Sequence, residues 1–443
     1  MTGPRPWKAA ALWLAFLGPF FFASYGFANW LASRRVDVGS VVFGWERHIP
    51  FLAWTIVPYW SIDLLYAGSL FVCATRQELS AHARRLLAAQ LVCVACFLAF
   101  PLRFSFSRPP AIEGAFGAMF TALVSFDKPF NQAPSLHIAL LILLWVRYAA
   151  HLGRAGRALL HVWFALIGIS VLTTWQHHFI DVPTGLWAGL FCLWLIPENA
   201  RTGAAHLSRE PKRLRLAVAY LIPGAALSVA GPVLGGWGWL LLWPGGALVL
   251  VAMIYLLGDA SLFRKEDGRI PAPAFWLLFP YLAGAWINSR LWTRRKPAPA
   301  EIGGGVLLGR IPTRRERQAA RARSLVDLAA ELPVDREGVA YRAAPMLDLL
   351  PPTVEQIDDA VAAVEELAAE RPTLLFCALG YGRGAIVSAA CLMASGRAAS
   401  VDEAISGVRR ARPEVVFTPA HRQRLEEWRS QRKDWTAWRA STI

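Results

Sequence analysis

A thiol and a guanidinium stand six residues apart in the run Thr373-Leu-Leu-Phe-Cys377-Ala-Leu-Gly380-Tyr-Gly382-Arg383. The apolar start of the run predicts a strand, and a helix is predicted to begin after the glycine-bearing loop. Backbone N–H groups converge at such a helix start, where they cradle an anion and favour a thiolate over a thiol. The guanidinium can hold two phosphate oxygens through its planar fork. The run therefore predicts a phosphate site in which the Cys377 thiolate attacks phosphorus.

A second group of reactive side chains lies in the apolar part of the chain. Ser135-Leu-His137 opens one predicted membrane span, and His177-His178-Phe-Ile-Asp181 opens another. Ionisable groups at a membrane boundary are costly, so they are functional candidates by default. A histidine with a carboxylate at helical spacing is the arrangement that holds an imidazole in one tautomer. The pattern predicts a histidine nucleophile for phosphorus with an orienting acid, and a second histidine that protonates the leaving group.

Two other interpretations of these histidines stay open. Three histidines and an aspartate could bind zinc, but no spacing typical of a zinc motif supports this, and we expect neither a metal nor a cofactor. The histidines could also cap helices at the membrane interface. Of the two neighbouring histidines, the spacing to Asp181 favours His177 over His178 as the nucleophile.

Two kinds of structure must position these sites. The chain has 443 residues, is 55% hydrophobic and has a mean hydropathy of +0.37, and apolar runs of bilayer-spanning length fill its first two thirds. The residues before Glu301 include 26 basic and 12 acidic side chains, which account for +14 of the net charge of +15. This balance indicates cytoplasmic loops and lipid phosphate. No basic region has the interleaved aromatics of a nucleic-acid site, so we expect no nucleic-acid partner.

Eight membrane spans are predicted from the apolar runs. They lie at approximately 9–30, 51–74, 85–102, 134–150, 156–174, 179–197, 215–233 and 237–257. A ninth stretch, 274–289, is shorter, so it could cross the membrane, re-enter it or lie at its surface. Gly185 and Gly189 form a GxxxG pair in the sixth span, which favours helix packing over chemistry.

The charges of the loops predict the orientation of these spans. Basic loops at 76–85, 147–157 and 201–215 fall on one side of the membrane, and the positive-inside rule makes that side cytoplasmic. The histidine site then faces outward. Both flanks of 274–289 are basic, which favours a segment that does not cross and leaves the cysteine site in the cytoplasm, a reducing compartment that suits a reactive thiolate.

The pattern changes to that of a soluble α/β domain after a basic tether that ends at Lys296. Strands are predicted at 306–309, 324–328, 339–347 and 373–379, and helices at about 353–370, 384–396, 400–411 and 418–432. We therefore predict three parts: a helical membrane domain over 1–200, further membrane helices and the tether over 201–297, and a compact α/β domain over 298–443.

The loop from Cys377 to Arg383 resembles the Cys-x5-Arg signature of protein tyrosine and dual-specificity phosphatases, and the resemblance covers about residues 301–435. The segment Tyr341-Arg-Ala-Ala-Pro-Met-Leu-Asp348 is similar to the general-acid loop of compact members of that family. This resemblance implies that Asp348 protonates the leaving oxygen and then activates water. A turn or a helix cap is the alternative role for Asp348.

Two residues beside the loop depart from that family. The family usually has histidine before the cysteine and serine or threonine after the arginine, where this chain has Phe376 and Gly384. The first difference bears on the reactivity of the thiol, and the second on the rate at which the thiophosphate intermediate breaks down. Slow turnover is therefore one expectation for this site.

The membrane motifs are similar to those of the type 2 phosphatidic acid phosphatase (PAP2) superfamily, especially its branch of phosphoinositol-transferring sphingolipid synthases. Pro-Ser135-Leu-His137 matches Pro-Ser-x-His, Ser170 with His177 and Asp181 matches Ser-x6-His-x3-Asp, and Arg108-Pro matches the Arg-Pro of the first motif. The resemblance covers about residues 50–200. It implies that His177 is the nucleophile, Asp181 its orienting acid and His137 the acid for the leaving group, while Arg108 and Ser135 hold phosphate.

Two cationic positions of that superfamily are missing here. The lysine six residues before Arg-Pro is absent, and Val171 stands where an arginine is usual. Lys128 or Arg103 could supply the charge. The presence of both halves in one chain resembles a bacterial group of fused lipid-phosphatase and dual-specificity phosphatase proteins.

These observations predict a bifunctional phosphatase of the bacterial inner membrane, with its histidine site toward the periplasm and its cysteine domain in the cytoplasm. Its substrates would be phosphate monoesters of lipids, lipid headgroups or polyprenyl carriers. As alternatives, the membrane half could transfer a phospho-headgroup to a lipid alcohol, or the cysteine domain could sense phosphate with little turnover. The sequence does not indicate an oligomeric state.

Overall fold

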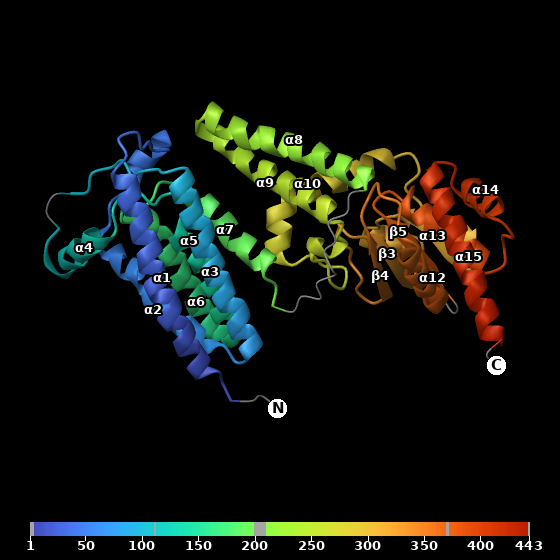
Figure 1. Cartoon of the computed structure of the whole chain (residues 1–443), viewed down its shortest axis with the longest axis horizontal. Coiled ribbons are helices and arrows are strands. Elements are labelled where there is room, and N and C mark those ends of the chain that lie inside the picture. The colour runs from blue at the N-terminus through green and yellow to red at the C-terminus, as the bar shows by residue number, and fades with distance from the viewer. Residues whose placement is uncertain (1–3, 110–111, 199–209, 369–371, 442–443) are drawn as a thin grey trace. The chain divides into compact units, whose positions relative to one another are not determined.

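The structure is a computed structural model that describes residues 4–109, 112–198, 210–368 and 372–441 (Figure 1). By their contacts the residues form two compact units, Met1–Arg201 with Leu234–Trp239, and Thr202–Val233 with Leu240–Ile443. Six of the described helices are long and apolar enough to cross a membrane. This is the character of a multi-pass membrane protein.

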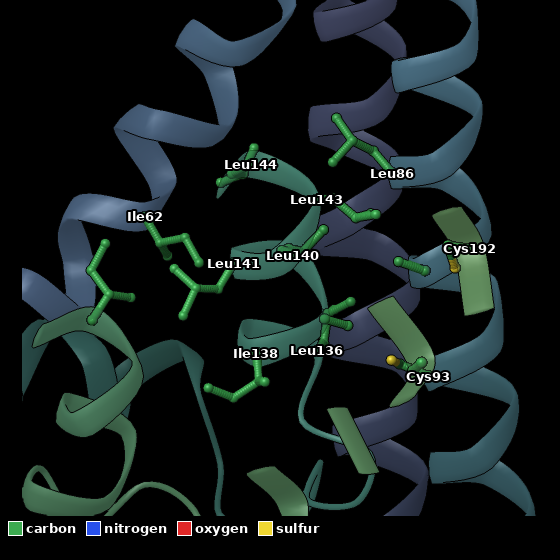
Figure 2. Close-up of a cluster of buried hydrophobic side chains, with 14 of the residues drawn as sticks. Ile62, Leu86, Cys93, Leu136, Ile138, Leu140, Leu141, Leu143, Leu144 and Cys192 are labelled. Carbon is green, nitrogen blue, oxygen red and sulfur yellow. The ribbon is translucent and has the colours of Figure 1, made fainter. Parts of the chain in front are cut away.

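The first unit is a bundle of apolar helices around α5. Its helices are α1 (Trp7–Ser33), α2 (Ile56–Val72), α3 (Arg76–Ala99), α4 (Gly114–Phe126), α5 (Leu136–His151), α6 (Arg154–Thr173) and α7 (Asp181–Leu195), with short 3-10 turns at Gly44–His48 and Ala53–Thr55. Figure 2 shows leucines of α5 lying among side chains of neighbouring helices, such as Ile62 and Cys93. Helix α5 packs against α2, α3, α6 and α7, which explains why it is apolar on almost every side.

Helices α5 and α7 approach closely because two residues of α7 have no side chain. A Cβ atom on Gly185 would lie 2.5 Å from the carbonyl oxygen of Ser135, and one on Gly189 would lie 2.8 Å from that of Ala139. The predicted packing role of this glycine pair is confirmed. The contact places the starts of both helices side by side, where the N–H of Ser135 donates to the carbonyl of Asp181 at 3.1 Å.

The third predicted span, 85–102, is wrong at its start, because α3 begins at Arg76 and the expected basic loop is helical. Thr75 caps this helix: its Oγ1 accepts the N–H of Glu78 at 3.1 Å. The Glu78 carboxylate is buried against Arg147 and His151 of α5. Partners on α5 therefore bury the acidic side chain at the start of this helix, while Arg76 and Arg84 stay exposed.

Two predicted spans, 134–150 and 179–197, correspond to helices that fall short of a full crossing. Helices α5 and α7 have 16 and 15 residues. At a rise of 1.5 Å per residue they extend about 24 and 22 Å, against a hydrocarbon thickness of about 30 Å. The six long apolar helices are α1, the Ala53–Val72 segment, α3, α6, α8 (Pro211–Leu234) and the Gly236–Leu257 segment. The apolar helix α4 was not predicted.

The second unit joins membrane helices to a small mixed sheet. Its helices before the sheet are α8, α9 (Leu242–Leu257) and α10 (Ala272–Trp292), with a 3-10 turn at Ala260–Phe263. The strands are β1 (Ala300–Gly303), β2 (Val306–Arg310), β3 (Ser324–Ala329), β4 (Ala340–Met346) and β5 (Thr373–Cys377), and their order is β1-β2-β5-β3-β4. Strand β1 pairs antiparallel with β2, and the other pairs are parallel.

Five further helices complete this part: α11 (Arg314–Ala319), α12 (Val354–Ala368), α13 (Arg383–Ala394), α14 (Val401–Ala411) and α15 (Pro419–Ser441). The four predicted strands and four predicted helices are therefore confirmed, within a few residues at their ends except that α15 extends to Ser441, beyond the predicted end at 432. The short elements β1 and α11 were not predicted. A strand of four residues and a helix of six carry too little periodicity to be read from sequence.

The two faces of the sheet are covered by different partners. Helices α12, α13, α14 and α15 pack on one face, which carries Leu308, Val326 and Leu375. Alternate residues point to the other face, where Leu374 and Phe376 belong to a second core and Ala285 of α10 packs against it. The ninth apolar stretch, 274–289, is thus part of α10, which is not among the six long apolar helices, and its second half lies against the sheet.

Candidate active sites

The Cys377 loop joins the end of β5 to the start of α13. The N–H of Gly380 donates to the Cys377 Sγ at 3.2 Å, so the backbone curls around the sulfur. Gly380 has a φ of +73°, and a Cβ atom there would lie 2.4 Å from the carbonyl oxygen of Gly309 in β2. Gly382 directly precedes the helix, which begins at Arg383. A thiol thus faces the N-terminal end of a helix, where the helix dipole favours negative charge.

The guanidinium of Arg383 is buried and fixed by a carboxylate that sequence reasoning missed. Nη1 donates to Glu331 Oε2 at 2.8 Å and Nη2 donates to Oε1 at 2.6 Å, a bidentate pair, and Nη1 also donates to the carbonyl of Met346 at 2.9 Å. Burial would raise the pKa of Glu331, but Arg383 holds it below its usual value. Glu331 follows β3 without a local motif, so only the fold reveals the pair.

Asp348 also pairs with the Arg383 guanidinium. Its Oδ1 is 3.1 Å from Arg383 Nη2, and its side chain is 31% exposed. Burial raises the pKa of Asp348, and the nearby Glu331 carboxylate raises it further, while Arg383 acts in the opposite direction. The next residue, Leu349, has a φ of +61°, an uncommon conformation for a residue with a side chain. Asp348 therefore lies beside Arg383, the last residue of the Cys377 loop.

The two departures from the phosphatase signature have structural consequences. Phe376 is fully buried in the core that Ala285 of α10 contacts, so its ring fills the face of the sheet away from the thiol. Gly384 lies within the first turn of α13, where a Cβ atom would be 3.8 Å from Cys377 Sγ and 2.7 Å from Leu308 Cδ1. A hydroxyl at residue 384 would therefore stand near the sulfur, and this chain has none there.

Both walls of the cysteine site are tied to membrane helices of the same unit. The hydroxyl of Tyr255, near the end of α9, donates to the carbonyl of Asp348 at 3.2 Å. The hydroxyl of Tyr381, in the phosphate loop, donates to the carbonyl of Trp292 at the end of α10, at 3.4 Å. The segment that carries Asp348 and the loop from Cys377 to Arg383 each meet the terminus of an apolar helix.

Two ion pairs, one of them buried, reinforce this attachment. Lys265, between α9 and α10, pairs with Asp327 of β3 at 2.5 Å and donates to the carbonyl of Ala329 at 2.7 Å. Burial raises the pKa of Asp327, and Lys265 opposes that rise. Arg290 of α10 pairs with Glu316 of α11 at 3.1 Å. These contacts join β3 and α11 to α10 and to the segment between α9 and α10.

The histidine site of the first unit is built from the starts of α5 and α7. His177 Nδ1 lies 3.0 Å from Asp181 Oδ2, and His177 Nε2 lies 3.1 Å from Ser135 Oγ. Asp181 Oδ2 also accepts the N–H of His178 at 3.1 Å. All three side chains of this relay are buried. An imidazole that donates from Nδ1 to a carboxylate presents the lone pair of Nε2, which is the atom required for attack on phosphorus.

His178 is held in a different set of contacts. Its Nδ1 lies 2.8 Å from Glu46 Oε2, and its Nε2 accepts the N–H of Ser105 at 3.1 Å. Glu46 was not predicted, since it comes from a distant 3-10 turn. Both nitrogens of each histidine have partners, but His177 Nε2 meets the rotatable hydroxyl of Ser135, whereas His178 Nε2 accepts a fixed backbone N–H, so the geometry favours His177 as the nucleophile. Among the described residues, no group of three or more His, Cys, Asp or Glu side chains could hold a metal ion.

Two other residues predicted for the histidine site, His137 and Arg108, make different kinds of contact. His137 stacks on Tyr59 with ring centroids 4.2 Å apart, and within the described part of the chain its Nε2 has no hydrogen-bond partner. Arg108 donates to the carbonyls of Thr174 and Trp175, at 3.1 and 2.9 Å, in the turn that precedes His177. His137 thus keeps a nitrogen available. The Arg108 side chain contacts the site through the backbone carbonyls of the turn that precedes His177.

Two predicted residues are less directly placed. Lys128 is exposed, and its neighbour Asp127 turns inward to accept the hydroxyl of Tyr25 at 2.9 Å. Ser170, from the same motif as His177, donates to the carbonyl of Ile167 in its own helix at 2.7 Å. The Ser170 hydroxyl therefore bonds within its own helix, α6, which ends shortly before His177.

Comparisons with known proteins gave a partial match. No family model matches the chain, and no curated protein matches it. Among solved structures, it is similar to Tk-PTP in its active form, with 32% identity over 30% of this chain and 97% of that one, at a TM-score of 0.28. Human DUSP28 has 21% identity over 31% of this chain and 99% of its own, at 0.28.

PTPMT1, solved in complex with PI(5)P, is similar at 19% identity over 31% of this chain and 98% of its own, with a TM-score of 0.29. These likenesses are to tyrosine and dual-specificity phosphatase-like domains, over about 30% of the chain. The function proposed below rests on the geometry of the sites.

Proposed function

We propose that the cysteine domain hydrolyses phosphate monoesters. The Cys377 thiolate attacks phosphorus, an S–P bond forms, the P–O bond breaks, and the leaving oxygen takes a proton from the Asp348 carboxyl. Water then attacks phosphorus and gives a proton to the Asp348 carboxylate, while the S–P bond breaks to return the thiolate and release inorganic phosphate. Arg383 and the loop N–H groups stabilise the charge that develops on the phosphoryl oxygens.

The convergence of Cys377, Arg383 and Asp348 at the start of α13 carries this proposal. The nucleophile lies in an anion cradle, and the acid lies 3.1 Å from the guanidinium that would hold the same phosphate. The raised pKa of Asp348 favours the protonated form that a general acid needs. The pair with Glu331 fixes the orientation of the Arg383 guanidinium before substrate binds.

The substrate class proposed for this domain is a phosphorylated lipid or lipid headgroup. The hydrogen bonds of Tyr255 and Tyr381 connect both walls of the site to the ends of α9 and α10. A headgroup at the membrane surface would meet the loop there without leaving its bilayer. On the basic flanks of the membrane helices, we place this domain in the cytoplasm.

Purified full-length protein tests the first proposal. We expect hydrolysis of p-nitrophenyl phosphate and of at least one lipid among phosphatidic acid, phosphatidylglycerophosphate, phosphoinositides and polyprenyl diphosphate. Cys377→Ser should abolish p-nitrophenyl phosphate hydrolysis, and His177→Ala should leave it intact. Phosphate binding without a trapped thiophosphate would support a sensor domain instead.

A second function is proposed for the histidine site, whose carrying observation is the Ser135–His177–Asp181 relay. His177 Nε2 would attack a lipid or polyprenyl phosphate, His137 would protonate the leaving oxygen, and water would release phosphate from the histidine. If a lipid alcohol takes the place of water, the same intermediate leads to transfer. A labelled phospholipid donor, incubated with and without alcohol acceptors, separates hydrolysis from transfer.

The pair His177 and His178 supplies a matched test of this second function. His177→Gln should remove acid-labile phosphate from the protein, and His178→Gln should retain it, because His178 is bound to Glu46 and Ser105. The reverse result would exchange the roles of the two histidines. The expected orientation, with this site toward the periplasm, is checked by a reporter fused after Ile443, which should be active in the cytoplasm.

A further inference from the structure

A tyrosine of the membrane helices meets the backbone of the general-acid segment. Tyr255 is 1% exposed and lies two residues before the end of α9. Its hydroxyl donates to the carbonyl oxygen of Asp348 at 3.2 Å. The carboxylate of the same Asp348 lies 3.1 Å from Arg383. Asp348 thus accepts a hydrogen bond from a membrane helix through its backbone carbonyl, and its carboxylate lies beside Arg383 in the proposed catalytic centre.

The segment that carries Asp348 needs external support. Leu349 has a φ of +61°, a conformation that costs free energy for a residue with a side chain and persists only where the surroundings impose it. Asp348 lies in a turn after the end of β4. A hydrogen bond to its carbonyl fixes the peptide plane from which the carboxyl projects.

Tyr255 is itself held in one place by an aromatic cluster that spans three helices. Its ring stacks on Tyr220 of α8, with centroids 5.3 Å apart, and Tyr220 meets Tyr281 of α10 edge to face at 5.7 Å. Phe263, in the turn between α9 and α10, stacks on Tyr281 at 5.9 Å. The hydroxyl that meets Asp348 therefore projects from a packed support rather than from a mobile side chain.

We propose that Tyr255 is a positioning residue for Asp348, through which the membrane helices set the alignment of the general acid. The inference rests on the proposed phosphatase function, in which Asp348 protonates the leaving oxygen. Tyr255 touches no reacting atom. Its effect should therefore depend on how much the reaction needs a proton, and should be largest for substrates with poor leaving groups.

Tyr255→Phe in the full-length protein tests this proposal with two substrates. We expect kcat/KM for phenyl phosphate, a poor leaving group, to fall about tenfold, and kcat/KM for p-nitrophenyl phosphate to change by less than about twofold, because kcat/KM reports the formation of the thiophosphate and not its breakdown. Asp348→Asn should show the same selectivity with a larger loss. Equal bursts of p-nitrophenol from wild type and variant report equal amounts of folded enzyme.

Tyr148→Phe is the matched control, since Tyr148 donates to the carbonyl of Leu65 at 2.8 Å in the first unit, and its loss should change neither rate. Equal losses with both substrates in Tyr255→Phe would show a merely structural role and overturn the proposal, as would no loss with either. If Asp348→Asn lacks leaving-group selectivity, the general-acid function itself fails, which is a separate result.

Discussion

Arg383 and Glu331 form a buried bidentate pair, with N–O distances of 2.6 and 2.8 Å, and the guanidinium also meets Asp348 at 3.1 Å. The side chains of Arg383 and Glu331 are 2% and 4% exposed. A charge pair at this depth is stable only with good geometry and further hydrogen bonds. The pair therefore fixes the Arg383 guanidinium beside Asp348, as the proposed phosphatase site requires.

Removing the charge of Glu331 should impair phosphate binding. In Glu331→Gln the guanidinium loses one of the two carboxylate oxygens that bind it. We therefore expect kcat/KM for p-nitrophenyl phosphate to fall about 10- to 100-fold, mainly through KM. Asp327→Asn is the control, because Asp327 is an equally buried carboxylate that pairs with Lys265. The role is refuted if kcat/KM is unchanged in a folded variant.

The same pair should make stability depend on pH in a defined window. The pKa of Glu331 is lowered in the folded state, so its stabilising contribution is complete above its unfolded pKa of about 4.3 and is lost as the pH falls through the folded value. The raised pKa of Asp348 acts with the opposite sign, since its contribution is lost as the pH rises.

Thermal unfolding in detergent, performed on the Asp348→Asn background, isolates the effect of Glu331. The midpoint should fall as the pH drops below about 4, by about 2–4 °C for each kcal/mol lost. Adding Glu331→Gln should flatten this dependence. A midpoint that falls equally in both proteins would assign the effect to other carboxyl groups.

Restoring a hydroxyl after Arg383 should speed the second chemical step. In Gly384→Ser, Leu308 Cδ1 must move from its 2.7 Å approach, and the new Cβ stands 3.8 Å from Cys377 Sγ. A hydrogen bond to the departing thiolate should raise the rate of thiophosphate breakdown about tenfold, measured by rapid quench. Gly384→Ala adds the same Cβ without the hydroxyl, so equal rates in the two variants would contradict this account.

Separating α5 from α7 should disable the histidine site alone. In Gly185→Ala the new Cβ would meet the carbonyl of Ser135 at 2.5 Å and push the two helix starts apart. We expect phosphate incorporation at His177 to fall at least tenfold, while p-nitrophenyl phosphate hydrolysis by the cysteine domain is retained. Gly168→Ala, whose Cβ would meet Leu141 at an ordinary 3.5 Å, should affect neither.

The sequence by itself determined the elements whose signals are local. The strand, glycine loop and helix around Cys377 follow from apolar alternation and from glycines that a tight loop requires. The pairing of His177 with Asp181 also followed from their spacing, although His177 lies in the turn before α7 and Asp181 is the first residue of that helix. One error lay in the polar start of α3, which was taken for a loop although it is helical, with its Glu78 buried against Arg147 and His151 of α5.

The tertiary structure decided the partners that come from distant segments. Glu331 reaches Arg383 from the end of a neighbouring strand, Glu46 reaches His178 from a turn 132 residues earlier, and Tyr255 reaches Asp348 from a membrane helix. Nothing in the spacing of these residues indicates such contacts, because each depends on how whole elements pack. The sequence supplied the reacting groups, and packing supplied the residues that hold them in place.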